Sequence, residues 1–323
     1  MHLLGLEGTA HTLGVGILED NGTILANIMK TYRPKEGIHP REAANHHASN
    51  MISTIEEAIT VAGIQREDIG LVSFSQGPGL GPCLRTVATA ARAMSLSLNV
   101  PMVGVNHCIA HIEIGRLTTE CSDPVLLYAS GGNTQVIAFS RGRYRVFGET
   151  LDIGVGNMLD KFGRENGMPF PAGPEIERRA ELSNNFIELP YSVKGMDVSF
   201  SGILTAALNS DKPLNDLCYS LQETVFAMLT EVAERALAHT GKNEVLLGGG
   251  VIRNKRLRDM ATIMAKERGA EAYAPPGPLC VDNGAMIAWT GYIMYESGLK
   301  TPVDQSGVMQ NFRTDEVDIT WRK

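Results

Sequence analysis

Two histidines one helical turn apart stand out as candidate metal ligands in this chain. His107 and His111 lie in the segment NHCIAHIEIGR, with Glu113 two residues further on. Residues at positions i and i+4 of a helix project from the same side, so two imidazoles with this spacing can chelate one metal ion. Two ordinary helix histidines share the spacing, and on this motif alone both interpretations stay open.

The neighbours of the pair argue against one metal-dependent reaction. A zinc protease of the HExxH type needs a glutamate directly after the first histidine as general base, and Cys108 stands there. Glu113 is not on the required face of the helix. Two histidines also leave a metal ion with open positions, so other ligands must come from elsewhere in the fold or from substrate. Cys108 and Cys280 are alternative ligands, although burial is the commoner state of a free cysteine.

Three glycine-rich turns indicate where a nucleotide could bind. Gly8 with Thr9 and Gly131 with Gly132 each follow a predicted strand, and LLGGGVIRNKRL (246–257) lies between a strand and a helix. Backbone N–H groups in such turns can approach phosphate or carboxylate without hindrance from side chains. The third cluster lacks the spacing of a Rossmann fingerprint. Together the turns favour a nucleotide site, while each alone is also consistent with a tight turn.

The elements that must position these residues form a weak internal repeat. Residues 3–25 and 124–150 are each typical of three short strands joined by glycine-containing turns. The first half continues with a helix, the buried strand LVSFSQ, a Gly/Pro loop and a second helix. The second half continues with a helix over 215–241 and the strand EVLLGGG. Two such copies predict two similar domains that face each other across a cleft.

Composition and charge limit the class of protein. A chain of 323 residues predicts two domains, and 43% apolar residues predict a globular core. The formal charge of −7 argues against a surface that coats nucleic acid or membrane, although a local basic patch is compatible with it. The five cysteines are odd in number and form no C-x-x-C pair, so neither a disulfide framework nor a zinc knuckle is indicated. Without a secretion signal or a long apolar run, we expect a cytoplasmic protein that does not enter a membrane.

Eight motifs in one collinear order carry a resemblance to a known family. The repeated meander with LLGGG resembles the actin, Hsp70 and sugar-kinase (ASKHA) superfamily of ATP-binding folds. More specifically, the chain resembles the archaeal and eukaryotic-type tRNA N6-adenosine threonylcarbamoyltransferases, the catalytic subunit of the KEOPS complex within the universal TsaD/YgjD family. The motifs are FSQGPGLGPCLR (74–85), NHCIAHIEIGR (106–116), YASGGNTQ (128–135), GVGNMLDKFGR (154–164), FPAGPEIE (170–177), VSFSGI (198–203), LGGGVIRNKRL (247–257) and PLCVDNGAMIA (278–288).

The resemblance implies a fold and domain limits. It implies an α/β protein of ASKHA fold, with two duplicated RNase H-like domains around a nucleotide- and metal-binding cleft. We expect residues 1–120 plus 289–323 to form the first domain and residues 121–288 the second. The apolar stretch that follows Ala288 is expected to cross back and pack on the first domain.

The resemblance also implies a reaction. The family transfers the threonylcarbamoyl group of threonylcarbamoyl-AMP to N6 of the adenosine adjacent to the tRNA anticodon and releases AMP. That amine is a weak nucleophile, so the electrophile must be held rigidly and its carbonyl polarised, as an open metal ion can do. The family's ligands match His107, His111, Tyr128 and Asp282. This donor set suits iron or zinc, with Fe²⁺ favoured by the resemblance and Zn²⁺ as the alternative.

Further site residues follow from the same motifs. We expect the backbone of residues 130–132 to suit phosphate and the threonylcarbamoyl end, and Asp160 and Glu177 to suit ribose hydroxyls. Asn254 either receives the adenine edge or supports the loop that holds it. His46 and His47 are adjacent, so they point to different sides of a helix and cannot chelate one ion together. The implied substrate contacts are Tyr128, Ala129, Ser130, Gly131, Gly132, Asp160, Gly173, Glu177 and Asn254, and the candidate phosphate or tRNA contacts are Gly8, Thr9, Arg85, Arg164, Arg253 and Lys255.

Partners are expected to help hold the tRNA, because the chain is acidic and only 6% of its residues are aromatic. The resemblance implies KEOPS subunits, namely a small kinase-like ATPase, a dimerising subunit and a further small subunit, and a separate synthase that supplies the adenylate. Three other interpretations stay open. The chain could be a sugar-kinase-type phosphotransferase, with Glu7 where such folds often carry an aspartate, a metalloprotease, or an ATP-binding scaffold without catalysis.

Overall fold

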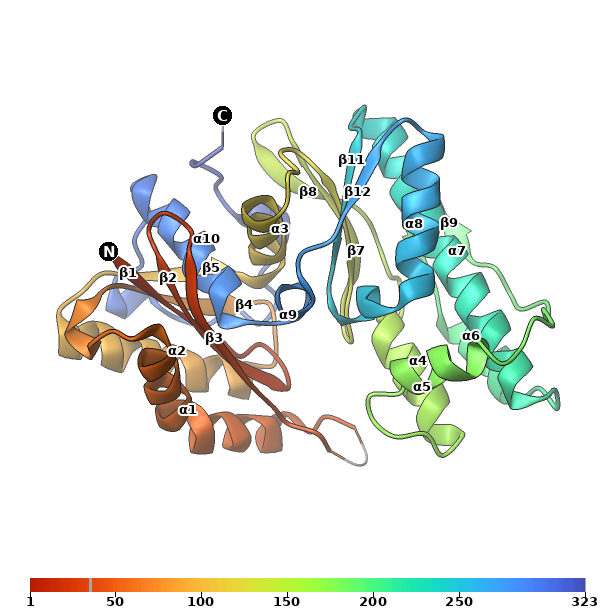
Figure 1. Ribbon diagram of the computed structural model, residues 1–323, viewed down its shortest axis with the longest axis horizontal. Helices are drawn as coiled ribbons and strands as arrows, with labels where there is room; N and C mark the ends of the chain where they lie inside the picture. The colour runs from red at the N-terminus through yellow and green to blue at the C-terminus, as the bar shows by residue number, and fades with distance from the viewer. Residues whose placement is uncertain (35–36, 323) are drawn as a thin grey trace. The chain divides into compact units, whose positions relative to one another are not determined.

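The computed structural model describes residues 1–34 and 37–322, and its contacts divide the chain into two compact units. Unit 1 comprises Met1–Thr118, Gly142–Tyr144 and Val281–Lys323, and unit 2 comprises Thr119–Arg141 and Arg145–Cys280. Figure 1 labels most of the elements of both units. The sequence predicts a boundary at Ala288, whereas the structure counts residues 281–288 with unit 1, because the helix that contains most of them packs on the first sheet.

Unit 1 is built on a five-stranded sheet with the order β3-β2-β1-β4-β5. The first three strands form an antiparallel meander, and β4 runs parallel to β1 and to β5. This arrangement confirms the three strands predicted for residues 3–25 and the buried strand after them. The strands are β1 His2–Glu7, β2 Thr12–Glu19, β3 Ile24–Thr31, β4 Ile69–Gly77 and β5 Met102–Asn106.

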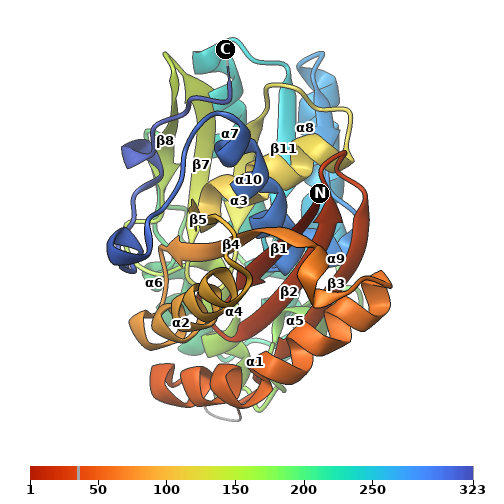
Figure 2. The same ribbon diagram turned by 90° about the vertical axis from the view of Figure 1, so that its left-hand side faces the viewer.

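One face of this sheet carries α1 (Pro40–Ala62) and α2 (Gly81–Leu98), which lie side by side in Figure 2. Successive strand residues point to opposite faces, so every second residue of β1 and β2 enters the core beneath these helices. The buried cluster there includes Leu4, Leu6, Val15, Ile17, Met51, Ile55 and Val87. Each helix ends before a residue in the left-handed conformation, Gly63 (φ 68°) or Asn99 (φ 54°).

The alternate residues of β1 and β2 include three glycines, and α10 (Gly284–Glu296) packs directly on them. A Cβ atom on Gly5 would lie 2.2 Å from the carbonyl oxygen of Gly284, and one on Gly16 would lie 2.2 Å from the amide nitrogen of Ala285. Glycine is therefore required for this helix to touch the sheet. The contact fixes the start of α10, and Asp282 lies immediately before the helix cap Asn283. It also confirms that the segment after Ala288 packs on the first sheet.

Unit 2 repeats this topology strand for strand. Its sheet has the order β12-β11-β6-β7-β8, with β6 antiparallel to β7 and parallel to β11, which is parallel to β12. The duplication predicted from the repeat is confirmed. The strands are β6 Val125–Ala129, β7 Thr134–Ser140, β8 Arg143–Glu149, β11 Glu244–Gly248 and β12 Glu271–Tyr273.

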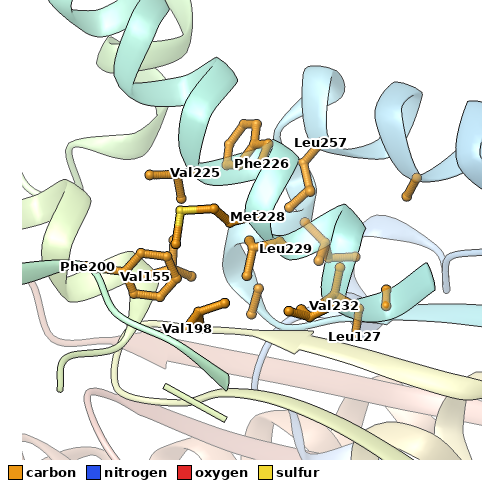
Figure 3. Packing of buried hydrophobic residues seen from close by; sticks show 14 of the residues in the cluster. Leu127, Val155, Val198, Phe200, Val225, Phe226, Met228, Leu229, Val232 and Leu257 are labelled. Atoms are coloured by element: carbon orange, nitrogen blue, oxygen red, sulfur yellow. The ribbon is translucent and has the colours of Figure 1, made fainter. Parts of the chain in front are cut away.

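The core of unit 2 lies between this sheet and the long helix α7 (Leu214–Thr240). Figure 3 shows Leu127 of β6 near Val232 of α7, and Leu257 of α8 (Lys255–Glu267) near Phe226 at the other end of the cluster. The remaining α-helices and strands are α3 His107–Thr118, α4 Val155–Glu165, α5 Gly173–Ala180, α6 Ser201–Leu208, α9 Gly277–Cys280, β9 Val193–Lys194 and β10 Asp197–Val198. Among the described residues, no helix is long and apolar enough to span a bilayer.

Candidate metal centre and active site

The histidine pair lies on α3, which begins directly where β5 ends. Asn106, the last residue of β5, caps the helix: its side-chain oxygen accepts hydrogen bonds from the N–H groups of Cys108 (3.0 Å) and Ile109 (3.2 Å). The strand and the cap thus set the direction of α3. His107 and His111 project from the same side, with ring centroids 4.9 Å apart, as their spacing predicts.

Asp282 joins the two histidines, and the three side chains form a group that could hold a metal ion. The Nε2 atoms of His107 and His111 each lie 3.4 Å from Oδ1 of Asp282. This separation is long for a hydrogen bond. It fits metal ligands, because two atoms each about 2.1 Å from an ion at a tetrahedral angle lie about 3.4 Å apart. The donor set therefore fits a transition metal ion.

Glu7 orients His107 from the other side of the ring. Its Oε2 lies 3.1 Å from Nδ1 of His107, and its Oε1 accepts hydrogen bonds from the N–H (2.7 Å) and hydroxyl (2.6 Å) of Thr9. Glu7 is fully buried. A carboxylate on Nδ1 places the ring proton there and leaves the Nε2 lone pair for a metal, which is the usual arrangement behind a ligating histidine. From the sequence, Glu7 was considered only for the kinase alternative. The signal that could have found its role beside His107 is that Glu7 is the one acid in the apolar strand β1 and ends it.

The protonation states of the group suit metal binding. Burial lowers the pKa of His111 below its ordinary value, although the nearby carboxylate of Asp282 opposes this effect. Burial acts to raise the pKa of Asp282, but the neighbouring His107 and His111 outweigh it and hold that pKa well below its ordinary value. Near neutral pH the carboxylate is charged and His111 is neutral, which are the forms that bind metal ions.

Glu113 faces away from this group and anchors α3 to other parts of unit 1. Its buried carboxylate accepts hydrogen bonds from the hydroxyl of Tyr144 (2.6 Å), the indole N–H of Trp321 (2.9 Å) and Arg116 (2.6 Å). It is not part of the metal-binding group of the described residues. The expectation that Glu113 is not a general base beside the histidines is consistent with these contacts.

In unit 2, the predicted anion-binding turn follows β6 and packs against the start of α4. The N–H groups of Gly156 and Asn157 donate to the carbonyl oxygens of Ser130 (3.0 Å) and Gly131 (2.9 Å). The N–H groups of Gly131 and Gly132 have no acceptor among the residues that the structure describes. The turn is thus held by its carbonyl groups and presents two N–H donors.

Space around this turn is open on one side. A Cβ atom on Gly132 would meet nothing within 4 Å, and Gly173 is equally unobstructed. Neither glycine has a positive φ, so neither packing nor backbone geometry requires glycine there. By contrast, Gly249 adopts φ +95° and lies against the carbonyl oxygen of Ala129. A ligand that must come close to the backbone is a physical reason for glycine at positions 132 and 173.

Three polar residues expected to bind substrate make contacts within unit 2. Asp160 accepts a hydrogen bond from the N–H of Ala172 (2.7 Å), and Glu177 accepts one from the N–H of Lys255 (2.7 Å). Asn254 caps α8 through its side-chain oxygen and donates its amide to Gln222 (2.8 Å). Of the two roles expected for Asn254, these bonds favour support of the loop.

The other ligand and the candidate phosphate contacts have different surroundings. Tyr128 is buried at the end of β6 in unit 2, and its role as a ligand stays a prediction. The N–H and hydroxyl of Thr9 are both bonded to Glu7, and the N–H of Gly8 donates to the hydroxyl of Ser75 (3.1 Å), so that turn supports the metal-binding group. Exposed side chains are Arg85, Arg164, Arg253 and Lys255, of which Arg164 pairs with Glu165 at 3.6 Å.

Neither the cysteines nor the neighbouring pair His46 and His47 belong to the metal-binding group found among the described residues. All five cysteines are buried and none forms a disulfide within the described chain, and burial raises the pKa of Cys108 and Cys280. His47 is fully buried, and burial lowers its pKa to about 4. These side chains pack within the fold, as the sequence predicts for the cysteines.

Comparison with known proteins identifies the relatives of this chain. The profile of the tRNA N6-adenosine threonylcarbamoyltransferase family, TsaD, matches residues 22–289. The enzyme of that name from Thermococcus kodakarensis is 56% identical over 326 residues, which cover 99% of this chain and 100% of the relative. A probable bifunctional tRNA threonylcarbamoyladenosine biosynthesis protein from Methanothermobacter thermautotrophicus is 60% identical over 327 residues; the match covers 100% of this chain but only 61% of that relative.

Solved structures share the fold. HypF from Thermococcus kodakarensis has a TM-score of 0.69 and 14% identity over 91% of this chain and 48% of its own. The (R)-2-hydroxyglutaryl-CoA dehydratase component A of Acidaminococcus fermentans has a TM-score of 0.58 and 13% identity over 90% and 98% of the two chains. These likenesses confirm the expected ASKHA fold. Given the family match over most of its length, the chain belongs to the TsaD family, the tRNA N6-adenosine threonylcarbamoyltransferases.

Proposed function

We propose that this chain transfers the threonylcarbamoyl group of threonylcarbamoyl-AMP to N6 of the adenosine adjacent to the anticodon, forming N6-threonylcarbamoyladenosine. Family membership makes the chain a transferase that acts on tRNA. The observation in this chain that best supports the detailed reaction is the group of His107, His111 and Asp282, with Glu7 behind His107. Cys108 follows His107 where an HExxH metalloprotease carries its general base, which supports a transferase over a protease.

The cofactor that we propose is one divalent metal ion, Fe²⁺ or alternatively Zn²⁺. His107, His111 and Asp282 would hold it, with Tyr128 as a fourth ligand. Nitrogen and oxygen donors of this kind suit either ion. When bound, the ion would supply Lewis-acid polarisation of the carbamoyl carbonyl. Glu7 keeps Nε2 of His107 unprotonated and correctly aimed, and the buried carboxylate of Glu113 holds the far side of the helix.

In the proposed step, the N6 amine attacks the carbamoyl carbon. A C–N bond forms, the bond from that carbon to the phosphate oxygen breaks, AMP leaves, and the amine loses one proton. We propose that the N–H groups of Gly131 and Gly132 hold the phosphate as negative charge returns to it; their lack of an acceptor within the described chain supports this role. The remaining proposed substrate contacts are Ala129, Ser130, Asp160, Gly173, Glu177 and Asn254.

Asp160 and Glu177 each use one carboxylate oxygen to hold a loop of unit 2. We propose that the ribose hydroxyls bind beside them and that Asn254 acts mainly as the cap that shapes this loop. A substrate bound there would contact elements that are already held by these hydrogen bonds, which lowers the entropic cost of reaching the reactive geometry.

The partners that we propose are a small kinase-like ATPase, a dimerising subunit and a further small subunit of a KEOPS complex, with a separate synthase for the adenylate. The low aromatic content and the charge of −7 support the need for help in holding tRNA. The bifunctional relatives, of which this chain spans about 61%, are named for a second activity on the same polypeptide. We also propose that the protein works in the cytoplasm.

The proposed function is tested by reconstitution. Purified protein is supplied with threonine, bicarbonate, ATP, the synthase and unmodified tRNA, with and without the companion subunits, and modified adenosine is measured by mass spectrometry. The expected product is N6-threonylcarbamoyladenosine. No product in the full mixture would contradict the proposal. ATP hydrolysis that needs no tRNA would instead favour a kinase-like or scaffold protein.

A further inference from the structure

The last segment of unit 1 contacts the elements that carry the metal-binding group. Residues 306–322, which we call the C-terminal strap, contain one 3₁₀ turn at Thr314–Glu316 and otherwise no helix or strand. Figure 2 draws the strap in dark blue. The side chains of Ser306, Thr314 and Val317 are nevertheless buried. A segment without regular structure of its own is kept in place by bonds to its neighbours, so these bonds show what the strap holds.

The first half of the strap is bonded to the Gly/Pro loop that follows β4. The N–H of Met309 donates to the carbonyl oxygen of Gln76 (2.8 Å), and the N–H of Gly79 donates to the carbonyl oxygen of Gln310 (3.1 Å). The side-chain amide of Gln76 also donates to the carbonyl oxygen of Gly307 (2.8 Å). Three hydrogen bonds thus fix this half of the strap against the loop.

The same loop is bonded to the carboxylate behind the first histidine. The N–H of Leu80 donates to the carbonyl oxygen of Thr9 (2.7 Å). Thr9 in turn donates its N–H and its hydroxyl to Glu7, whose other oxygen lies 3.1 Å from Nδ1 of His107. The strap is therefore connected to His107 through the loop.

The middle of the strap contacts the start of α3. The side-chain amide of Asn106, which caps this helix through its oxygen, donates to the carbonyl oxygen of Phe312 (3.1 Å). An amide donates only from its nitrogen, so the carbonyl of Phe312 turns the oxygen of Asn106 towards the helix. One residue beyond His107, the thiol of Cys108 is hydrogen-bonded to the buried side chain of Thr314.

The end of the strap contacts the second half of α3. The indole N–H of Trp321 donates to the carboxylate of Glu113 (2.9 Å). Arg322 donates to the hydroxyl of Tyr144 (2.9 Å), and that hydroxyl donates to the same carboxylate (2.6 Å). The strap thus holds α3 at residues 106, 108 and 113, on both sides in sequence of His107 and His111.

We propose that the C-terminal strap positions the metal-binding histidines, with Phe312, Thr314 and Trp321 as its positioning residues; this inference rests on the metal site of the proposed function. Ligands must be held to within about 0.5 Å. A rotation of α3 by about 10° would move an atom about 6 Å from its axis by about 1 Å, which exceeds that tolerance. Bonds at both ends of the ligand pair oppose such a rotation.

The test compares two variants that each remove one donor from the strap, Thr314→Val and Trp321→Phe, and their double variant. The matched control is Ser306→Ala, which removes a bond of 2.7 Å from Arg92 of α2 and lies on the same strap but contacts no residue of α3 in the printed bonds of the described chain. Metal-free protein is titrated with Zn²⁺ and Co²⁺ in competition with a chelator, at a temperature where urea unfolding shows every variant to be folded.

We expect a graded loss of metal affinity. A group bonded directly to a ligating histidine contributes about 10- to 100-fold, and the strap residues act one residue further away. Each single variant is therefore expected to lose about threefold and the double variant about tenfold, whereas Ser306→Ala stays within twofold of wild type. The visible absorption of bound Co²⁺, which depends on ligand geometry, should shift in the double variant and not in the control.

The outcomes separate this inference from the proposed function. A wild type that binds neither ion would contradict the metal site itself. A wild type that binds metal, together with a double variant of unchanged affinity and Co²⁺ absorption, would overturn the role of the strap. An equal loss of affinity in Ser306→Ala would also overturn it, because general destabilisation would then explain the effect. If Trp321→Phe does not fold, an unchanged affinity in Thr314→Val alone refutes the proposal.

Discussion

Replacing Glu7 by glutamine should weaken metal binding without removing any ligand. The carboxylate accepts from Nδ1 of His107 on one oxygen and from the N–H and hydroxyl of Thr9 on the other. In Glu7→Gln, an amide NH₂ must face one of these sides. If it faces His107, Nδ1 becomes an acceptor, the proton moves to Nε2, and that nitrogen no longer binds a metal. If it faces Thr9, two donors oppose each other.

The expected cost follows from either arrangement. Loss of a carboxylate behind a ligating histidine lowers metal affinity about 10- to 100-fold, which corresponds to about 1.4 to 2.7 kcal/mol. Affinity for Zn²⁺, and for Fe²⁺ without oxygen, is measured by competition with a chelator. Glu19→Gln, an exchange on β2, is the matched control. Metal affinity of Glu7→Gln within twofold of wild type would refute the idea that Glu7 sets the tautomer of His107.

Three further predictions concern packing, anchoring and pH. Gly132→Ala should be as stable as wild type, because the added Cβ meets no atom within 4 Å, but it should bind the adenylate at least about tenfold more weakly. Gly5→Ala should lower the free energy of unfolding by about 3 kcal/mol or more, since its Cβ would lie 2.2 Å from the backbone of α10. Both are measured by urea denaturation and nucleotide titration, and equal stability of the two would contradict the packing argument. Trp321→Phe removes a hydrogen bond to the buried carboxylate of Glu113 and should cost about 1.5 to 3 kcal/mol of unfolding free energy, an expectation that an unchanged urea midpoint would disprove. Burial lowers the pKa of His47 to about 4 in the folded protein. Between pH 6.5, its ordinary pKa, and pH 4, the unfolded chain therefore binds one more proton than the folded protein, and the free energy of unfolding falls with pH by up to about 3 kcal/mol. A His47→Gln variant with the same loss of stability between pH 7 and pH 4.5 would count against this assignment.

Most of the fold was predictable because its signals are local. Alternating apolar residues and Gly-containing turns predicted both meanders, and their repetition predicted the duplicated sheets. The boundary near Ala288 was not predictable in this way. The position of α10 depends on Gly5 and Gly16, which lie far away in the sequence and permit backbone contact only after the sheet has formed.

The candidate site was predictable in part for the same reason. The spacing of His107 and His111 is a local signal, so the helix face that they share could be inferred directly. Asp282 came from the family resemblance, because nothing near it in the sequence links it to α3. Glu7 was missed as a partner of His107: the two residues are separated by 100 positions, and only the pairing of β1, β4 and β5 brings them together.

The measurement that tests the central claim most directly is metal content and transfer activity in the same preparation. Wild type, His111→Ala and the control His239→Ala are purified without oxygen, analysed for bound metal, and assayed for N6-threonylcarbamoyladenosine in the full mixture. We predict that wild type and the control carry metal and form product, and that His111→Ala loses both. A His111→Ala protein that lacks metal but keeps full activity would contradict the role assigned to His107, His111 and Asp282.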